Sequence, residues 1–154
     1  MNYADFKKGT FEDLVNAANS QYARKRVAFI NKSENGYEGI YKRKKLSFVA
    51  KFAKGRSFDL NEISDEQLEH FEKIELRGGY CFLLIEFLET RTVYFVPFSI
   101  IRHYVYHSKY GGRSYIPEND LNYYAYGVNR SQRAILDYLV LVDHLIGNEA
   151  KKKA

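Results

Sequence analysis

Residues 80–87 have the sequence YCFLLIEF. Every residue in it except Glu86 is apolar. A continuous apolar run of this length is typical of a strand that is buried on both faces of its sheet. Burial of both faces requires helices above and below the sheet. The run therefore predicts an α/β protein with this strand at its centre.

Helix and strand signals flank this run. Ser64-Asp65-Glu66-Gln67 has the pattern of a capping box, which satisfies the first backbone amides of a helix. We expect that helix to run to Arg77 and to end at Gly78-Gly79, because glycine readily adopts the left-handed conformation found after helices. Beyond the central strand, we expect a strand over 92–96 and a helix over 98–106.

The remaining elements follow from periodicity and turn residues. Thr10 can cap a first helix, whose apolar residues repeat at helical spacing as far as Tyr22. We expect strands over 27–30, 37–42 and 45–53, a loop over 108–122, and a last helix over 131–146 that stops at Gly147. The sequence thus predicts a mixed five-stranded sheet flanked by helices.

Length and composition limit the class of protein. The chain has 154 residues, of which 45% are hydrophobic, so we expect a single domain over 1–148 and a frayed basic tail over 149–154. No apolar run approaches the ~20 residues of a membrane span, and Met1–Lys8 lacks the apolar region of a signal peptide. Because Cys81 is the only cysteine, we expect no disulfide, no cysteine-based zinc site and a cytoplasmic location.

Charge is segregated along the chain. Residues 14–58 hold eleven Lys or Arg and two acids, whereas residues 59–89 hold nine acids and two bases. This pattern indicates one basic and one acidic surface, and a basic surface attracts polyanions such as nucleic acid. The alternative is that these runs are simply solvated faces.

The basic segments supply the candidate DNA-binding residues. Most are Lys or Arg near predicted strand ends and turns, where they can reach phosphates. Tyr110 joins them because it precedes Gly111-Gly112 in the predicted loop and can stack on a base. The candidates are Arg24, Lys25, Arg26, Lys42, Arg43, Lys44, Lys45, Lys51, Lys54, Arg56, Arg102, Lys109, Tyr110 and Arg113.

The predicted strands over 37–53 are where a nuclease site would lie. A metal-dependent nuclease needs carboxylates on adjacent strands to hold Mg²⁺, and a lysine beside them. Residues two apart on a strand share a face. Lys51 is such a lysine, but Val49 occupies the position that an acid would need, and Ser47 is no substitute.

Short motifs occur in a fixed order between Gly9 and Ile146. They are Thr10–Tyr22, Gly39–Lys42, Phe48–Lys51, Ser57–Phe58, Asp65–His70, Gly78–Phe82, Val93–Pro97 and Asp137–Leu145. In this order and spacing, the sequence resembles the RecU-type Holliday-junction resolvases of Gram-positive bacteria, within the PD-(D/E)XK nuclease group. The resemblance implies a restriction-endonuclease-like core, DNA as the partner and a homodimer.

The departures from that family concern its active site. Gly36 stands where the family has an aspartate, and Val49 where it has a glutamate, while the family's Lys51 and Gln67 remain. The family's long stalk is replaced by the short segment Ile30–Gly36. We therefore expect a noncatalytic DNA-binding protein without metal or cofactor.

Three alternatives remain open at this stage. Glu38 shares a strand face with Gly36 and, assisted by Glu12, could serve as a migrated metal ligand in an active junction endonuclease. A phage or mobile-element protein could instead use this scaffold to bind or inhibit a nucleic-acid enzyme. His103 and His107 are four residues apart on a predicted helix and form a possible metal pair, but no third ligand is in view.

Overall fold

The computed structural model describes residues 3–153. A six-stranded mixed sheet forms its centre, in the order β1-β2-β3-β5-β6-β8. Strands β3 and β5 run parallel, and the other neighbours in the sheet pair antiparallel. The strands are β1 (Phe29–Ser33), β2 (Gly36–Tyr41), β3 (Lys44–Ala53), β5 (Tyr80–Phe87), β6 (Thr92–Pro97) and β8 (Tyr126–Gly127).

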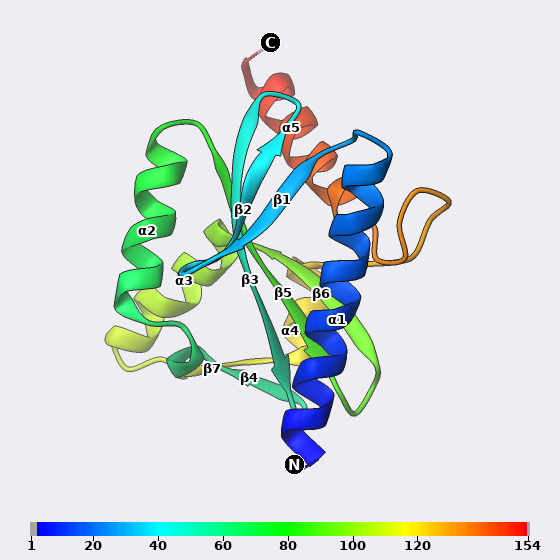
Figure 1. The fold of residues 1–154 in the computed structure, drawn as a ribbon. Coiled ribbons are helices and arrows are strands. Elements are labelled where there is room, and N and C mark those ends of the chain that lie inside the picture. Colours follow the sequence, from blue (N-terminus) through cyan, green and yellow to red (C-terminus); the bar gives the residue numbers. More distant parts are fainter. Residues whose placement is uncertain (1–2, 154) are drawn as a thin grey trace.

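Helices cover both faces of this sheet (Figure 1). Helices α1 (Tyr3–Arg24) and α5 (Leu139–Lys153) pack on one face, with Phe48 and Phe82 in their hydrophobic cluster. Helices α2 (Asp65–Leu76) and α3 (Phe98–Lys109) pack on the other, against Leu83 and Ile85. Because successive residues of β5 enter opposite clusters, the α/β architecture and the central buried strand predicted from residues 80–87 are confirmed.

The predicted start of α2 is also confirmed. The Ser64 side chain accepts a hydrogen bond from the Gln67 amide at 3.1 Å, so Ser64 is the N-cap. The helix ends at Leu76, and Gly78 follows with a φ of +87°, as expected for a glycine after a helix.

The predicted loop over 108–122 is wrong, because this segment forms two further elements. Strand β7 (Tyr115–Pro117) pairs with β4 (Ser57–Asp59) in a second sheet, and helix α4 (Glu118–Tyr124) follows it; a 3₁₀ turn, η1 (Leu60–Glu62), follows β4. Glu118 is buried and accepts hydrogen bonds from Thr90 and Tyr94 at 2.7 and 2.8 Å. These long-range contacts stabilise the two elements. The apolar residues of the segment are too few to show the spacing of a helix or a strand, so the sequence pattern does not reveal them.

Some helix boundaries and the number of strands in the sheet also differ from expectation. Helix α1 begins at Tyr3 rather than at Thr10. Helix α5 begins at Leu139, passes through Gly147 and ends at Lys153, so residues 149–153 of the expected basic tail are helical. The sheet has one strand more than predicted, because the two-residue strand β8 pairs with β6.

The late start of α5 has a physical cause. Asp137 accepts hydrogen bonds from Ser131 at 2.7 Å, from Arg133 at 2.9 Å and from Tyr22 of α1 at 2.7 Å. These bonds hold residues 131–138 in an irregular conformation. Burial alone would raise the pKa of Asp137, but its hydrogen bonds outweigh burial and lower that pKa below its ordinary value.

None of the helices described between residues 3 and 153 is long and apolar enough to cross a bilayer.

Candidate nucleic-acid interface

Strands β2 and β3 place Gly36 and Val49 side by side. Tyr37 pairs with Phe48, so the residue before Tyr37 lies opposite the residue after Phe48. A Cβ atom added to Gly36 would lie 2.7 Å from Cγ1 of Val49 and 2.4 Å from the Phe48 carbonyl oxygen. Gly36 also has a φ of +113°, and Val49 is only 7% exposed. The two positions therefore form a contact that contains no carboxylate, which we call the closed contact.

Lys51 lies two residues beyond Val49 on β3. It borders a hollow of about 460 Å³ together with Glu12 from α1, Asp59 at the end of β4 and Glu62 from η1. The structure thus brings Glu12 and Lys51 together. Glu12 also forms an ion pair with Lys32, with 3.6 Å between their charged atoms.

Glu38 faces α2 rather than this hollow. Its Oε1 lies 2.5 Å from Nε2 of His70 and 3.5 Å from Oγ of the buried Ser47. Its carboxylate is therefore already engaged by two neighbours. His70 was not identified from the sequence, although its spacing of three residues from Gln67 puts both on one face of α2.

Gln67, which the resemblance implies as a site residue, lies near the start of α2. Its side-chain Nε2 is buried and has no hydrogen-bond partner among residues 3–153. An unpaired buried donor carries a cost of about 1–3 kcal/mol, and no hydrogen bond within the described residues offsets this cost for Gln67.

The residues present do not fit a magnesium centre. Mg²⁺ takes oxygen ligands and is usually held in proteins by one or two carboxylates besides water, and the closed contact offers no carboxylate. Across the described residues 3–153, no group of three or more His, Cys, Asp or Glu side chains is arranged to hold a metal ion. This also applies to His103 and His107, whose ring centroids lie 4.3 Å apart without a third ligand.

A cationic hollow lies at the turn between β2 and β3. The turn residues Lys42 and Arg43 have φ values of 50° and 66°, as in a type I′ hairpin turn. Arg43, Lys44, Lys45 and Arg77 border a hollow of about 300 Å³, which we call the basic hollow. None of these four side chains forms an ion pair with a described residue. Arg77 was not identified from the sequence, although it closes the helix that leads to Gly78.

Several other predicted DNA-binding cations already have protein partners. Lys25 donates to the carbonyls of Gln132 and Arg133. The others form ion pairs with acids, and the hydrogen bond to Asp143 raises the pKa of Lys42. These pairs are Lys42–Asp143, Arg56–Glu118, Arg102–Glu72 and Arg113–Asp120.

The remaining predicted contacts are more scattered. Arg24 and Arg26 lie at the end of α1, and Lys51 and Lys54 border the hollow beside Glu12. Lys109 and Tyr110 lie at the end of α3, where the Tyr110 ring packs 4.9 Å from that of Tyr106. The predicted residues therefore do not form one patch, and the basic hollow is the densest group.

The chain is similar to one family of proteins. The family model described as Recombination protein U matches residues 31–144. A Holliday junction resolvase RecU from Staphylococcus aureus is 30% identical to this chain, over 96% of the chain and 73% of that protein. The Holliday junction resolvase RecU from Limosilactobacillus fermentum is 31% identical, over 82% of this chain.

Coverage of the relatives is partial. This chain spans about three fifths of several of them, with 61% of the Limosilactobacillus fermentum protein and 61% of the Bacillus licheniformis protein. Among solved structures, the Holliday junction resolvase Hjc of Archaeoglobus fulgidus has a TM-score of 0.37 and 13% identity to this chain. That likeness covers 62% of this chain and 72% of the archaeal one.

Proposed function

The chain belongs to the RecU family, and on this basis we propose that it binds branched or duplex DNA through the basic hollow without cutting it. The relatives carry the name Holliday junction resolvase, which makes DNA the partner to test. The absence of cutting is a proposal about this chain alone.

One observation carries the noncatalytic part of the proposal, namely the contact between Gly36 and Val49. The resemblance puts the family's two metal-binding acids at these positions, which lie beside each other as a shared metal site requires. Here the space between them is filled by Cγ1 of Val49 and the Phe48 carbonyl. A divalent cation would lose water ligands there and gain no carboxylate in return.

The binding part of the proposal is supported by the unpaired cations. Four basic side chains surround one hollow, and no acid among the described residues neutralises them. Each cation that neutralises a phosphate releases a condensed counterion, so four contacts give a slope of log K against log salt of about −3.6.

We further propose that the chain acts as a homodimer that presents two basic surfaces to a junction. Phe29 and Ile40 support this, because they are cross-strand neighbours on β1 and β2 and are 61% and 64% exposed. Large apolar side chains exposed together often mark a surface that another protein covers.

The second candidate is a protein-binding function, and a groove between α2 and α3 favours it. Asp65 and Glu69 line one wall of this groove, and the exposed rings of Tyr106 and Tyr110 line the other. A partner that remains bound after nuclease treatment of a bacterial lysate would support this candidate over DNA binding.

Fluorescence anisotropy tests the binding proposal. Labelled four-way junction and matched linear duplex are titrated with protein between ~50 and ~200 mM salt. We expect affinity to fall steeply over this range. An affinity that does not change with salt concentration, or no binding at the lowest salt concentration, contradicts the proposal. The ratio of the two affinities shows whether the protein prefers junctions.

A further inference from the structure

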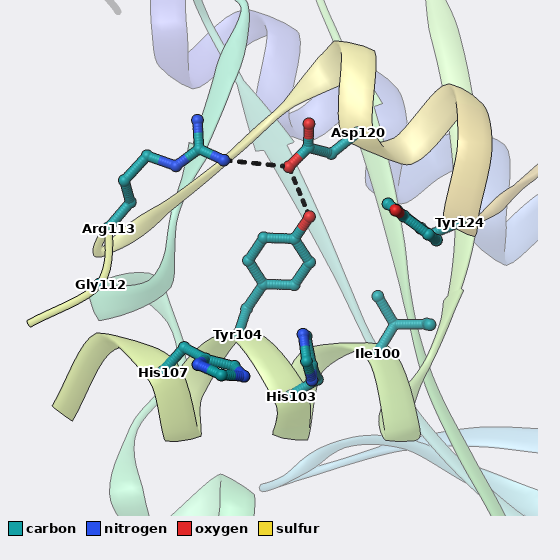
Figure 2. A pocket seen from close by; sticks show the side chains of 8 residues that line it. All are labelled: Ile100, His103, Tyr104, His107, Gly112, Arg113, Asp120 and Tyr124. Atoms are coloured by element: carbon teal, nitrogen blue, oxygen red, sulfur yellow. Dashed lines mark hydrogen bonds and ion pairs between the residues drawn. The ribbon is translucent and has the colours of Figure 1, made fainter. Parts of the chain in front are cut away.

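A separate pocket lies between helix α3 and the segment that runs from Gly112 through α4 (Figure 2). Its volume is about 560 Å³, and it shares no lining residue with the basic hollow or with the hollow beside Lys51. Its side walls are formed mainly by rings and charged groups, and we call it the aromatic pocket. The residues that matter here are His103, Tyr104, His107, Arg113, Asp120 and Tyr124.

One carboxylate organises the far wall. Tyr104 donates its hydroxyl to Oδ2 of Asp120 at 2.5 Å, and a guanidinium nitrogen of Arg113 lies 3.4 Å from the same oxygen (Figure 2). Burial and this hydrogen bond raise the pKa of Tyr104, so its phenol stays a donor. The Asp120 carboxylate thereby joins Tyr104 and the cation of Arg113 in one wall of the pocket.

The backbone at Gly112 brings that wall close to α3. The Gly112 amide donates to the His107 carbonyl at 2.8 Å. A Cβ atom at this position would lie 2.6 Å from the same carbonyl oxygen, so only glycine permits the approach without a shift. The close approach holds the start of this segment against α3.

The near wall presents rings whose polar atoms are unused. His103 and His107 lie one turn apart on α3, with ring centroids 4.3 Å apart. Neither imidazole, nor the hydroxyl of Tyr124, makes a hydrogen bond with any residue that the structure describes. Figure 2 shows both imidazoles and the Tyr124 ring around the opening. A pocket lined by aromatic rings whose polar atoms are unused suits a ligand that is planar and has polar edges.

We propose that the aromatic pocket binds one unpaired nucleotide of DNA. The base stacks among the rings of His103, His107 and Tyr124. Stacking on aromatic side chains tolerates any base, because every base has a π face. The volume lies within the range of pockets that hold small ligands. This inference rests on the proposed DNA-binding function and adds that unpaired nucleotides are recognised at a second place.

A fluorescent base tests this directly. A duplex with a single bulged 2-aminopurine is titrated with the full chain, and its fluorescence is followed together with anisotropy. Stacking in the pocket quenches the base. We expect Tyr124→Ala to abolish most of the quenching and to weaken binding of the bulged duplex about tenfold, with no change for a fully paired duplex. His103→Ala should act in the same direction.

The chain offers a matched control. Tyr123 is the neighbour of Tyr124 and is 86% exposed, but it does not line the pocket. Tyr123→Ala should leave the quenching unchanged, and circular dichroism verifies that both variants fold. If Tyr123→Ala and Tyr124→Ala have equal effects, or if the base stays bright in a saturated complex, the inference is overturned.

Failure of the pocket differs from failure of DNA binding. If the paired duplex binds and the bulged base stays bright, only the pocket inference fails. If neither duplex binds, the proposed function fails, and 2-aminopurine riboside 5′-phosphate is then titrated by itself. Quenching that Tyr124→Ala removes supports the pocket, and the absence of quenching overturns it.

Discussion

The two ends of the hairpin formed by β2 and β3 contrast in what they offer a nucleic acid. At its turn, Arg43, Lys44 and Lys45 join Arg77 around a hollow in which no described acid neutralises them. At its other end, Gly36 and Val49 close against each other without a carboxylate. In the function that we propose, the turn of this element binds phosphate, while the positions where the resemblance to the RecU family implies metal ligands are closed. If binding and cutting depend on these different residues, as we propose, one can be lost without the other.

The largest effect is expected at the basic hollow. Combined replacement Arg43→Ala, Lys44→Ala and Lys45→Ala should weaken duplex binding about 100- to 1,000-fold, ~3–4 kcal/mol, and reduce the salt slope by about 3. Anisotropy titrations at several salt concentrations measure both. Lys42→Ala is the control, because Lys42 is already paired with Asp143 at 2.7 Å. Equal losses for Lys42→Ala would break the contrast between paired and unpaired cations.

The next effect concerns the closed contact. Gly36→Ala should lower the free energy of unfolding by about 2–3 kcal/mol, because the new methyl meets the Phe48 carbonyl in addition to the strain of a positive φ. Gly78→Ala isolates the strain, since Gly78 has a φ of +87° and nothing within 4 Å of an added Cβ. Its cost should be about 1 kcal/mol. Urea unfolding measures both variants, and similar costs would show that the space beside Val49 is open.

The stability of the protein in acid is expected to depend on Asp137. The pKa of Asp137 is lowered from its ordinary 3.8, so the stability that its ionised form contributes is complete above that value. This stability disappears as the pH falls below 3.8 through the folded-state pKa. Asp137→Asn should cost about 2 kcal/mol at neutral pH and should flatten the acid limb of stability. Unfolding curves between about pH 2 and 7 measure this, and an unchanged acid limb would contradict it.

The smallest effect is expected at Glu38. Glu38→Ala removes the partner of His70 and Ser47 and should cost about 1 kcal/mol of stability. DNA affinity should change less than about twofold, because a phosphate contact gains nothing from this carboxylate. The same variant tests the alternative hypothesis that the chain is an active junction endonuclease. If the unaltered chain cuts DNA in the presence of metal and Glu38→Ala abolishes this cutting, Glu38 would be a migrated metal ligand.

Local signals made much of the fold predictable. The both-face burial of residues 80–87 and the cap at Ser64 are encoded within a few neighbouring residues, and both are confirmed. The elements over 115–124 and the start of α5 were not predicted. They depend on Glu118 and Asp137, whose hydrogen-bond partners in β6 and α1 are remote in sequence.

The candidate site also has features that are predictable from the sequence and features that are not. Strand register makes the proximity of Gly36 and Val49 predictable, because neighbouring strands pair in a fixed pattern. Whether a given lysine is paired is not predictable. Lys42 and Lys44 are near neighbours in sequence, yet Lys42 finds Asp143 on α5, 101 residues away. The contact between Glu38 and His70 likewise depends on how α2 lies across β3.

One experiment tests the central claim that this scaffold binds without cutting. Labelled four-way junction is incubated with the protein and Mg²⁺ or Mn²⁺, and each tube is divided between a native and a denaturing gel. We expect a shifted band on the native gel and full-length strands on the denaturing gel. Specific cleavage products in the metal-containing tubes would contradict it, because they would require ligands that replace Gly36 and Val49.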